Sequence, residues 1–154
     1  MVTCKSILVP TDFSETSHAA LDYGRALADR CSSTLHVFHV VSDFVSPGLA
    51  MYWGFSASEQ ESRLEEEARH QMEALLFELG GLQASVVTRV GRPSVEIVQY
   101  AKNQNVDLIV MGTNRRGLLA HLRVGGVVEK VARKAPCPVL TVQLPRARAR
   151  PALT

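Results

Sequence analysis

Two glycine-bearing segments in the second half of the chain have the residue types that bind phosphate groups. Gly112 directly follows the apolar run Leu108–Met111, and the pair Gly125-Gly126 comes just before a run typical of a helix. Backbone N–H groups in such loops, together with the positive end of a following helix, can converge on one anion. The spacing therefore predicts an anion site between a strand end and a helix start.

A group of polar residues follows the first apolar run of the chain. Asp12 comes directly after Pro10 and Thr11, and Ser14 follows two residues later. A carboxylate at a strand end can accept hydrogen bonds from a sugar or a base. Alternatively, Asp12 and Ser14 only end the strand and cap the next helix, which is common for an Asp-Phe-Ser turn. The sequence leaves both interpretations open.

Hydrophobic periodicity predicts the strands that must position these residues. Apolar and β-branched runs alternate with segments whose apolar residues have helical spacing. The predicted strands are Ser6–Pro10, Thr34–Val41, Ser85–Val90, Val106–Met111 and Val139–Val142.

The segments between these strands predict amphipathic helices. Ser14 is expected to cap the first helix, and Ser58 with Glu61 forms a capping-box pattern for the second, which Gly80-Gly81 ends. Pro93 suits the first turn of a third helix over Ser94–Asn103. The expected sheet-facing stripes are Ala19, Tyr23, Ala26 and Leu27 on the first helix, and Leu64, Ala68, Met72, Leu75 and Leu79 on the second.

This alternation predicts an α/β fold with a doubly wound, five-stranded parallel sheet and helices on both faces. Ligands of such sheets bind beyond the carboxyl ends of the strands, where the winding reverses. If the first strand lies next to the fourth, Asp12 lies beside Gly112. Periodicity alone does not distinguish between the possible strand orders.

The segments Val9–Ser14, Met111–Gly117 and Gly125–Glu129 together resemble the nucleotide site of the universal stress protein family. The resemblance extends from Ile7 to Val142. It implies an adenine nucleotide alpha hydrolase-like fold with strand order 3-2-1-4-5, and ATP or another adenine nucleotide as ligand, with Mg²⁺ only alongside the nucleotide. The binding residues that it implies are Pro10, Thr11, Asp12, Val40, Met111, Gly112, Arg115, Gly125, Gly126, Val127 and Val128.

The phosphate loop departs from the family pattern at two positions. Family members that bind ATP have G-x-x-G, nine further residues, and then G-[S/T]; here Arg115 replaces the second glycine and Gly126 replaces the hydroxyl residue. A Cβ at 115 obstructs close backbone approach, and Gly126 lacks a hydroxyl donor. We expect weaker triphosphate binding, unless the guanidinium groups of Arg115, Arg116 and Arg123 compensate by binding phosphate.

Enzymatic interpretations lack a complete set of residues, so the chain is expected to be a binding protein rather than an enzyme. His36 and His39 lie three apart on one strand and point to opposite faces, and no Walker A lysine, G-x-S-x-G or H-E-x-x-H motif occurs. The main hypothesis is a stress-response module that binds or senses an adenine nucleotide as a dimer. The alternatives are an interaction protein of the same fold without nucleotide, and a slow ATP hydrolase.

The composition predicts a single domain over residues 1–145, followed by a basic, disordered tail over 146–154. The chain has 17 basic and 15 acidic residues, and three of the basic ones are in the tail, so the body has no charge pattern for nucleic acid. Three scattered cysteines and the lack of a long apolar segment predict a cytoplasmic protein without a membrane span.

Two further segments are predicted to contact partners or ligand. The strand Val139–Val142 has no charged residue and would lie at a sheet edge, which favours a homodimer through this strand. The long apolar connection Asp43–Ala57 suggests a lid over the base, a surface that binds a partner, or a loop that packs across its own subunit or a dimer interface.

Overall fold

The computed structural model describes residues 3–42, 56–113 and 126–144. Five strands in these ranges form a single parallel sheet in the order β3-β2-β1-β4-β5. The strands are β1 (Ser6–Thr11), β2 (Thr34–Ser42), β3 (Ala84–Gly91), β4 (Leu108–Gly112) and β5 (Val139–Val142). The predicted fold class and the strand order implied by the family resemblance are confirmed.

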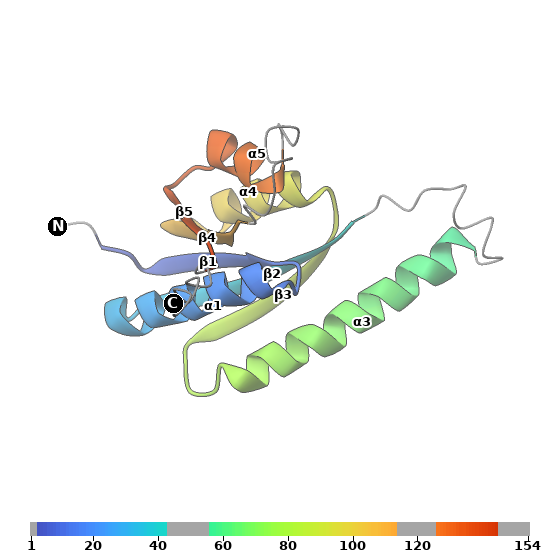
Figure 1. Ribbon diagram of the computed structural model, residues 1–154, viewed down its shortest axis with the longest axis horizontal. Coiled ribbons are helices and arrows are strands. Elements are labelled where there is room, and N and C mark those ends of the chain that lie inside the picture. Colours follow the sequence, from blue (N-terminus) through green and yellow to red (C-terminus); the bar gives the residue numbers. More distant parts are fainter. Residues whose placement is uncertain (1–2, 43–55, 114–125, 145–154) are drawn as a thin grey trace, which may run out of the picture.

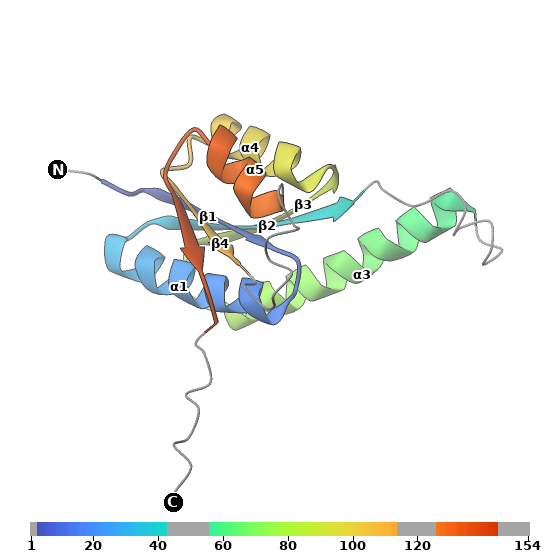
Figure 2. The same ribbon diagram turned by 45° about the horizontal axis from the view of Figure 1, so that its top comes forward.

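Helices cover both faces of this sheet. Figures 1 and 2 show α1 and α3 on one face, and α4 with α5 on the other. Their bounds are α1 (Glu15–Cys31), α3 (Ala57–Glu78), α4 (Pro93–Asn103) and α5 (Val127–Lys134). None of the helices in the described ranges is long and apolar enough to cross a membrane.

The sheet divides the core into two apolar layers because successive strand side chains point to opposite faces. On β1, Ile7 and Val9 pack beneath α1 and α3, whereas Leu8 packs beneath α4 and α5. All three side chains are fully buried. β1 is therefore the central strand, and its carboxyl end, which carries Asp12, is held on both faces.

Three helical details of the sequence prediction differ from the structure. On α1, Ala19 and Leu27 pack against the core as predicted, but Tyr23 and Ala26 are exposed, and the fully buried residues include Ala20, Leu21, Gly24 and Ala28. The capping box of α3 is Ser56 with Glu59, two residues before the predicted pair. The stripe on α3 is confirmed from Ala68 to Leu79, but Leu64 is exposed.

Several predictions fall outside the described residues. These are the tail over 146–154, the loop residues 43–55, and the positions Arg115 and Gly125 of the phosphate loop. The division into a domain over 1–145 and a tail remains a prediction.

Candidate functional site

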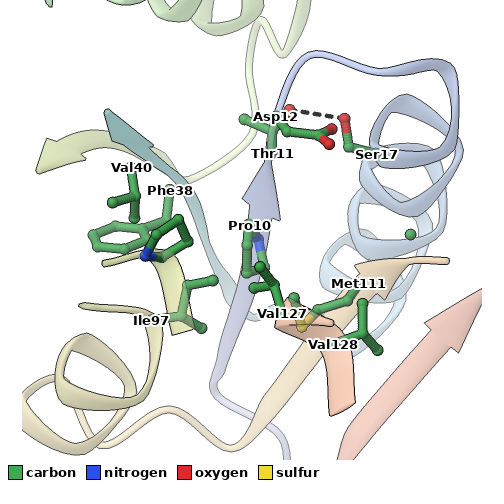
Figure 3. Close-up of a pocket in the computed structure, with 12 residues that line it drawn as sticks. Pro10, Thr11, Asp12, Ser17, Phe38, Val40, Ile97, Met111, Val127 and Val128 are labelled. Atoms are coloured by element: carbon green, nitrogen blue, oxygen red, sulfur yellow. Dashed lines mark hydrogen bonds between the residues drawn. The ribbon is translucent and has the colours of Figure 1, made fainter. Parts of the chain in front are cut away.

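A pocket with a volume of about 170 Å³ lies at the carboxyl ends of β1 and β4. This is the position where the winding of the sheet reverses, because β1 has β2 on one side and β4 on the other. Figure 3 shows its side chains. The lining residues are Pro10, Thr11, Asp12, Ser17, Phe38, Val40, Pro93, Ile97, Met111, Gly112, Val127 and Val128.

One wall of the pocket is an apolar slot built by elements from the α4 and α5 side of the sheet. Phe38 and Val40 come from alternate positions of β2 and therefore share one face. Ile97 enters from α4, and Val128 enters from the first turn of α5. The Phe38 ring also packs on Tyr100 of α4, with ring centroids 4.5 Å apart, so this wall is fixed from behind.

The opposite rim is a polar turn between β1 and α1 whose hydroxyl groups are hydrogen-bonded to one another. The Ser17 hydroxyl donates to the carbonyl of Ser14 at 2.8 Å, so the 3.1 Å contact between the Thr11 and Ser17 hydroxyls (Figure 3) has Thr11 as donor. The Phe13 N–H in turn donates to the Thr11 hydroxyl at 3.0 Å. The turn is thus tied together before any ligand binds.

Asp12 is oriented by this turn. Its Oδ1 accepts a hydrogen bond from the Ser14 N–H at 3.0 Å and a second from the Ser14 hydroxyl. Burial alone would raise the pKa of the Asp12 carboxyl, but the hydrogen bonds from Ser14 outweigh this effect and hold the pKa below its usual value. At neutral pH the pocket rim therefore carries a fixed negative charge.

Phe13 and His39 support this rim from the other face of the sheet. Phe13 has a φ of 62°, which is rare for a residue with a side chain, and such strain often occurs at functional sites. Its ring lies 4.4 Å from the His39 ring, measured between centroids. The His39 Nδ1–H donates to the carbonyl of Thr11 at 2.8 Å, so β2 holds the end of β1 in place.

Gly112 is required by packing. A Cβ at this position would overlap the backbone carbonyl of Thr16, in the first turn of α1. The lack of a side chain at 112 therefore lets α1 approach β4 closely. Gly112 also lines the pocket, but its glycine identity does not by itself indicate a phosphate site.

Gly126 occupies a different environment at the start of α5. It is the N-cap residue, with φ −60° and ψ 166°, and a Cβ added there would meet nothing within 4 Å among the described atoms. Since glycine has no side chain, it cannot cap the first amides of the helix. These amides and the helix dipole make this end of α5 attractive to an anion.

The structure places most of the predicted site residues around the pocket. Eight of them line it, namely Pro10, Thr11, Asp12, Val40, Met111, Gly112, Val127 and Val128. Gly126 directly precedes the lining residue Val127 in the sequence. The structure adds Ser17, Phe38, Pro93 and Ile97. The two-residue period of β2 could have revealed Phe38, and the i, i+4 spacing at the start of α4 could have revealed Pro93 with Ile97.

His36 belongs to a separate polar cluster and does not line the pocket. Its Nδ1 lies 2.9 Å from the Tyr100 hydroxyl and 3.2 Å from the Ser85 hydroxyl. Burial lowers the pKa of the His36 ring. His36 contacts α4 whereas His39 contacts the Phe13 turn, so the two rings point to opposite faces, as predicted, and the described residues contain no group suited to a metal ion.

Comparison with known proteins gives consistent matches over nearly the whole chain. A family model described as the universal stress protein family matches residues 3–143. The universal stress protein MJ0577 of Methanocaldococcus jannaschii is 34% identical over 157 residues, which span 92% of this chain and 96% of that protein.

Solved structures agree with this match. The structure of MJ0577 superposes with a TM-score of 0.76 at 33% identity, covering 95% of this chain and all of the other. Universal stress protein UspA from Lactobacillus plantarum superposes with a TM-score of 0.75 at 27% identity, covering 92% and 99% of the two chains.

Proposed function

This chain belongs to the universal stress protein family, and from that premise we propose that its strand-end pocket binds an adenine nucleotide. The observation that carries the proposal is that one pocket combines an apolar slot, a fixed carboxylate and a helix start. These three features match the chemistry of a nucleotide, which has a flat base, a hydroxyl-bearing sugar and anionic phosphates. The protein acts as a binding or sensing module for the stress response.

The base is proposed to lie in the slot between Phe38, Val40 and Ile97, since aromatic and branched side chains suit a planar ring. Asp12 would then accept hydrogen bonds from sugar hydroxyls or base N–H groups at the rim. The phosphates would extend from the slot towards Gly126, where the Val127 and Val128 amides have no partner within the helix. A nucleotide bound in this way spans the strand ends of β1 and β4.

The loop departures set the expected preference among nucleotides. A glycine at 126 supplies an amide but no hydroxyl, so the terminal phosphates receive fewer hydrogen bonds than with serine or threonine. We therefore propose that the discrimination in favour of ATP over AMP is small. Mg²⁺ is proposed to bind only through the phosphates of a nucleotide.

Two structural neighbours were solved with adenine nucleotides. One is a universal stress protein in complex with cAMP, and the other is the Archaeoglobus fulgidus protein in complex with dAMP. At 21% and 20% identity these neighbours support the fold alone. The nucleotide proposal therefore depends on the pocket residues of this chain.

The same proposal includes a cytoplasmic homodimer. β5 is the last strand of the sheet, and in the described residues it pairs only with β4. Leu140 is 38% exposed on it. An uncharged edge with an exposed apolar side chain favours pairing with a second copy of the same strand. The cytoplasmic location is proposed from the scattered free cysteines.

A second candidate function is an interaction protein that has kept the fold without the ligand. This candidate is favoured by the packing of Gly112, because the close approach of α1 alone accounts for the first glycine of the predicted phosphate loop. In that case the pocket would stay empty. A protein partner would then recognise the strand-end surface.

Mass spectrometry of the purified protein distinguishes the two candidates. The chain is purified without added nucleotide, denatured, and the released small molecules are identified, with Asp12→Ala purified in parallel. We expect an adenine nucleotide from the native chain and much less from Asp12→Ala. If nothing is released, and ATP, ADP and AMP all fail to bind when added with and without Mg²⁺, the second candidate is correct. Turnover of added ATP in the same samples would indicate slow hydrolysis.

A further inference from the structure

The three cysteines of the chain gather at the end of the sheet opposite to the nucleotide pocket. Cys4 comes just before β1, Cys31 is the last residue of α1, and Cys137 comes just before β5. All three are free thiols. Because the strands are parallel, their amino ends share one edge of the sheet, and α1 returns the chain to that same edge.

Cys4 and Cys31 share an open pocket at this edge. The lining residues are Thr3, Cys4, Lys5, Cys31, Ser32 and Thr34. Two hydrogen bonds close the turn after Cys31 against the segment that contains Cys4. The Ser33 hydroxyl donates to the carbonyl of Cys4 at 2.6 Å, and the Thr34 N–H donates to the carbonyl of Lys5 at 2.8 Å.

The turn itself brings Cys31 back towards Cys4. Ser32 has a φ of 53°, and its N–H bonds to the carbonyl of Ala28, so the chain reverses direction immediately after Cys31. Cys31 is thus only two residues from the side chain that touches Cys4. A disulfide needs Cα atoms within about 7 Å of one another, so the two thiols that line this pocket must come this close for the bond to form. Cys4 lies just before β1, outside the paired part of the strand.

Cys137 is placed differently, although it lies at the same edge. It packs against the apolar layer beneath α4 and α5, whereas Cys4 packs against the layer beneath α1 and α3. Cys4 and Cys137 thus pack against different layers, although Cys4 is near enough to contribute to the raised pKa of the Cys137 thiol. Cys31 is on the same side as Cys4 because it belongs to α1.

We propose that Cys4 and Cys31 form an intramolecular disulfide when the protein is oxidised by a peroxide. The proposal assigns a reversible modification site to the edge of the sheet far from the nucleotide pocket. It does not depend on the proposed nucleotide binding. The disulfide would link the start of β1 to the end of α1, the two elements whose other ends carry Asp12 and Ser17.

The chemistry proceeds in two balanced steps. The sulfur of one cysteine, as thiolate, attacks a peroxide oxygen, so that an S–O bond forms, the O–O bond breaks, and hydroxide leaves and takes up a proton. The second cysteine sulfur then attacks the resulting sulfenic acid, so that the S–S bond forms and the S–O bond breaks with loss of water. Overall, two thiols are oxidised to a disulfide, and hydrogen peroxide is reduced to two molecules of water.

The environments of the two thiols indicate their order. Cys31 is exposed, whereas Cys4 is half-buried. Burial raises the pKa of the Cys4 thiol, and the negative charge of Asp107 raises this pKa further. A hydrogen bond involving Ser33 lowers it, but by less than burial raises it. Cys4 therefore stays protonated at neutral pH and is a poor first nucleophile. Cys31 is assigned as the thiol that reacts with peroxide, and Cys4 as the thiol that resolves the sulfenic acid.

Peptide mapping of the oxidised full-length chain tests this assignment. The reduced protein is treated with hydrogen peroxide, remaining thiols are alkylated, and the digest is analysed without reductant. We expect a linked pair of peptides containing Cys4 and Cys31, which separates again after treatment with dithiothreitol. The link should be lost in Cys4→Ser and in Cys31→Ser, and it should be retained in Cys137→Ser, the matched control.

Three outcomes would overturn the proposal. In the first, Cys31 is oxidised to sulfinic acid while Cys4 remains open to alkylation. In the second, the link joins Cys4 to Cys137. In the third, two chains are joined through Cys31, which a gel without reductant detects as a doubled mass. Circular dichroism of each serine variant verifies that a lost link does not result from unfolding.

Discussion

Asp12 shows how neighbouring residues set the state of a side chain at the residue scale. The Ser14 side chain and backbone both donate to one oxygen of Asp12, and the Thr11 and Ser17 hydroxyls hold the turn that presents it. The carboxylate is therefore kept ionised and oriented by bonds within one short turn. Such an arrangement lowers the cost of ordering a binding group when the ligand arrives.

The first residue-scale prediction concerns Gly126. No described atom lies within 4 Å of a Cβ added at Gly126, and its φ of −60° suits any residue, so Gly126→Ser fits the described backbone. The new hydroxyl would donate to a phosphate oxygen, and a hydrogen bond to a charged group contributes about 1.5–3 kcal/mol, or about tenfold or more in affinity. We expect ATP to bind at least tenfold more tightly in calorimetry.

The matched control for this change is Gly126→Ala, which adds the Cβ without the hydroxyl. It should leave ATP affinity close to that of the native chain. Equal ATP affinity in the serine and alanine variants would show that no phosphate reaches residue 126. Combining Gly126→Ser with Arg115→Gly tests the second departure from the family loop, and a loss of affinity on adding Arg115→Gly would identify the arginine as a ligand.

A second residue-scale prediction follows from the packing of Gly112. The methyl group of Gly112→Ala would overlap the carbonyl of Thr16, so α1 must shift away from β4. Overpacking of this kind costs about 1–3 kcal/mol. Urea unfolding should show this loss for Gly112→Ala and a smaller one for Gly126→Ala, where the same methyl group meets no described atom within 4 Å. If both variants unfold at the same urea concentration, α1 does not need the glycine.

At the element scale, the structure shows which sequence signals are strong. Strand periodicity and turn residues predicted all five strands to within two residues, because buried parallel strands need continuous apolar runs. The fully buried stripe of α1 was missed because small residues form most of it. Ser17, Ala20 and Gly24 carry little hydrophobic signal, yet they let the helix approach the sheet closely.

The pocket shows the same division between what the sequence predicts and what it does not. Asp12 could be predicted because it directly follows a strand that ends at the switch point of the sheet, whereas Val40 and Met111 were implied only by the family resemblance. The position of Ile97 and Pro93 in the pocket depends on how the start of α4 packs against the strand ends, which the sequence pattern does not specify. The different roles of Gly112 and Gly126 likewise could not be predicted from the sequence, because they depend on which atoms surround each glycine in the fold.

The capping box of α3 gives an element-scale prediction. The Ser56 hydroxyl accepts from the Glu59 N–H at 3.3 Å, and the Glu59 carboxylate accepts from the Ser56 N–H at 3.0 Å. Ser56→Ala should therefore weaken the start of the helix by about 0.5–2 kcal/mol. Hydrogen exchange of the Glu59 amide should become faster. In Ser58→Ala, at the capping position predicted from the sequence, the change should be smaller, and the opposite order would contradict the structure.

A second element-scale prediction concerns the pH dependence that His36 brings to the contact between β2 and α4. Because burial lowers the folded pKa of His36, the unfolded chain binds more protons and stability rises with pH. The contribution is complete above the unfolded value of about 6.5 and is lost as pH falls below it towards the folded pKa.

Urea unfolding at about pH 7.5 and about pH 5.5 measures this effect. The native chain should lose more stability between the two pH values than His36→Asn, which cannot titrate. His70→Asn, at an exposed position on α3, should behave as the native chain does. Equal losses in the native chain and in His36→Asn would show that the buried ring is not responsible.

At the scale of the whole molecule, the parallel sheet separates two chemical regions. The carboxyl edge carries the pocket proposed for the nucleotide, and the amino edge carries the thiols of Cys4 and Cys31. Only β3 and β5 have one pairing neighbour within the described sheet. An assembly through the edge strand β5 would leave both other sites uncovered. The pocket lies at the carboxyl ends of the strands, and the thiol pair lies at their amino ends.

The dimer prediction belongs to this scale. The carbonyls of Val142 and of Pro138, just before β5, accept hydrogen bonds from the N–H groups of Thr113 and Ile109, so the backbone of Thr141 points away from β4. Thr141→Pro removes an outward N–H donor without removing a bond to β4. Light scattering should give twice the chain mass of 16.9 kDa for the native protein and a single chain mass for Thr141→Pro. A doubled mass that persists in Thr141→Pro would place the interface elsewhere.

Titration calorimetry of ATP, ADP and AMP into the native chain, Asp12→Ala and Asp22→Ala tests the central claim most directly. Asp22 is an exposed aspartate on α1 that does not line the pocket, so it controls for the loss of a charge. We expect one adenine nucleotide per native chain and unchanged affinity in Asp22→Ala. In Asp12→Ala the affinity should fall by about tenfold or more, since a charge-assisted hydrogen bond contributes about 1.5–3 kcal/mol. Absence of binding by the native chain, or unchanged affinity in a folded Asp12→Ala, would contradict the account.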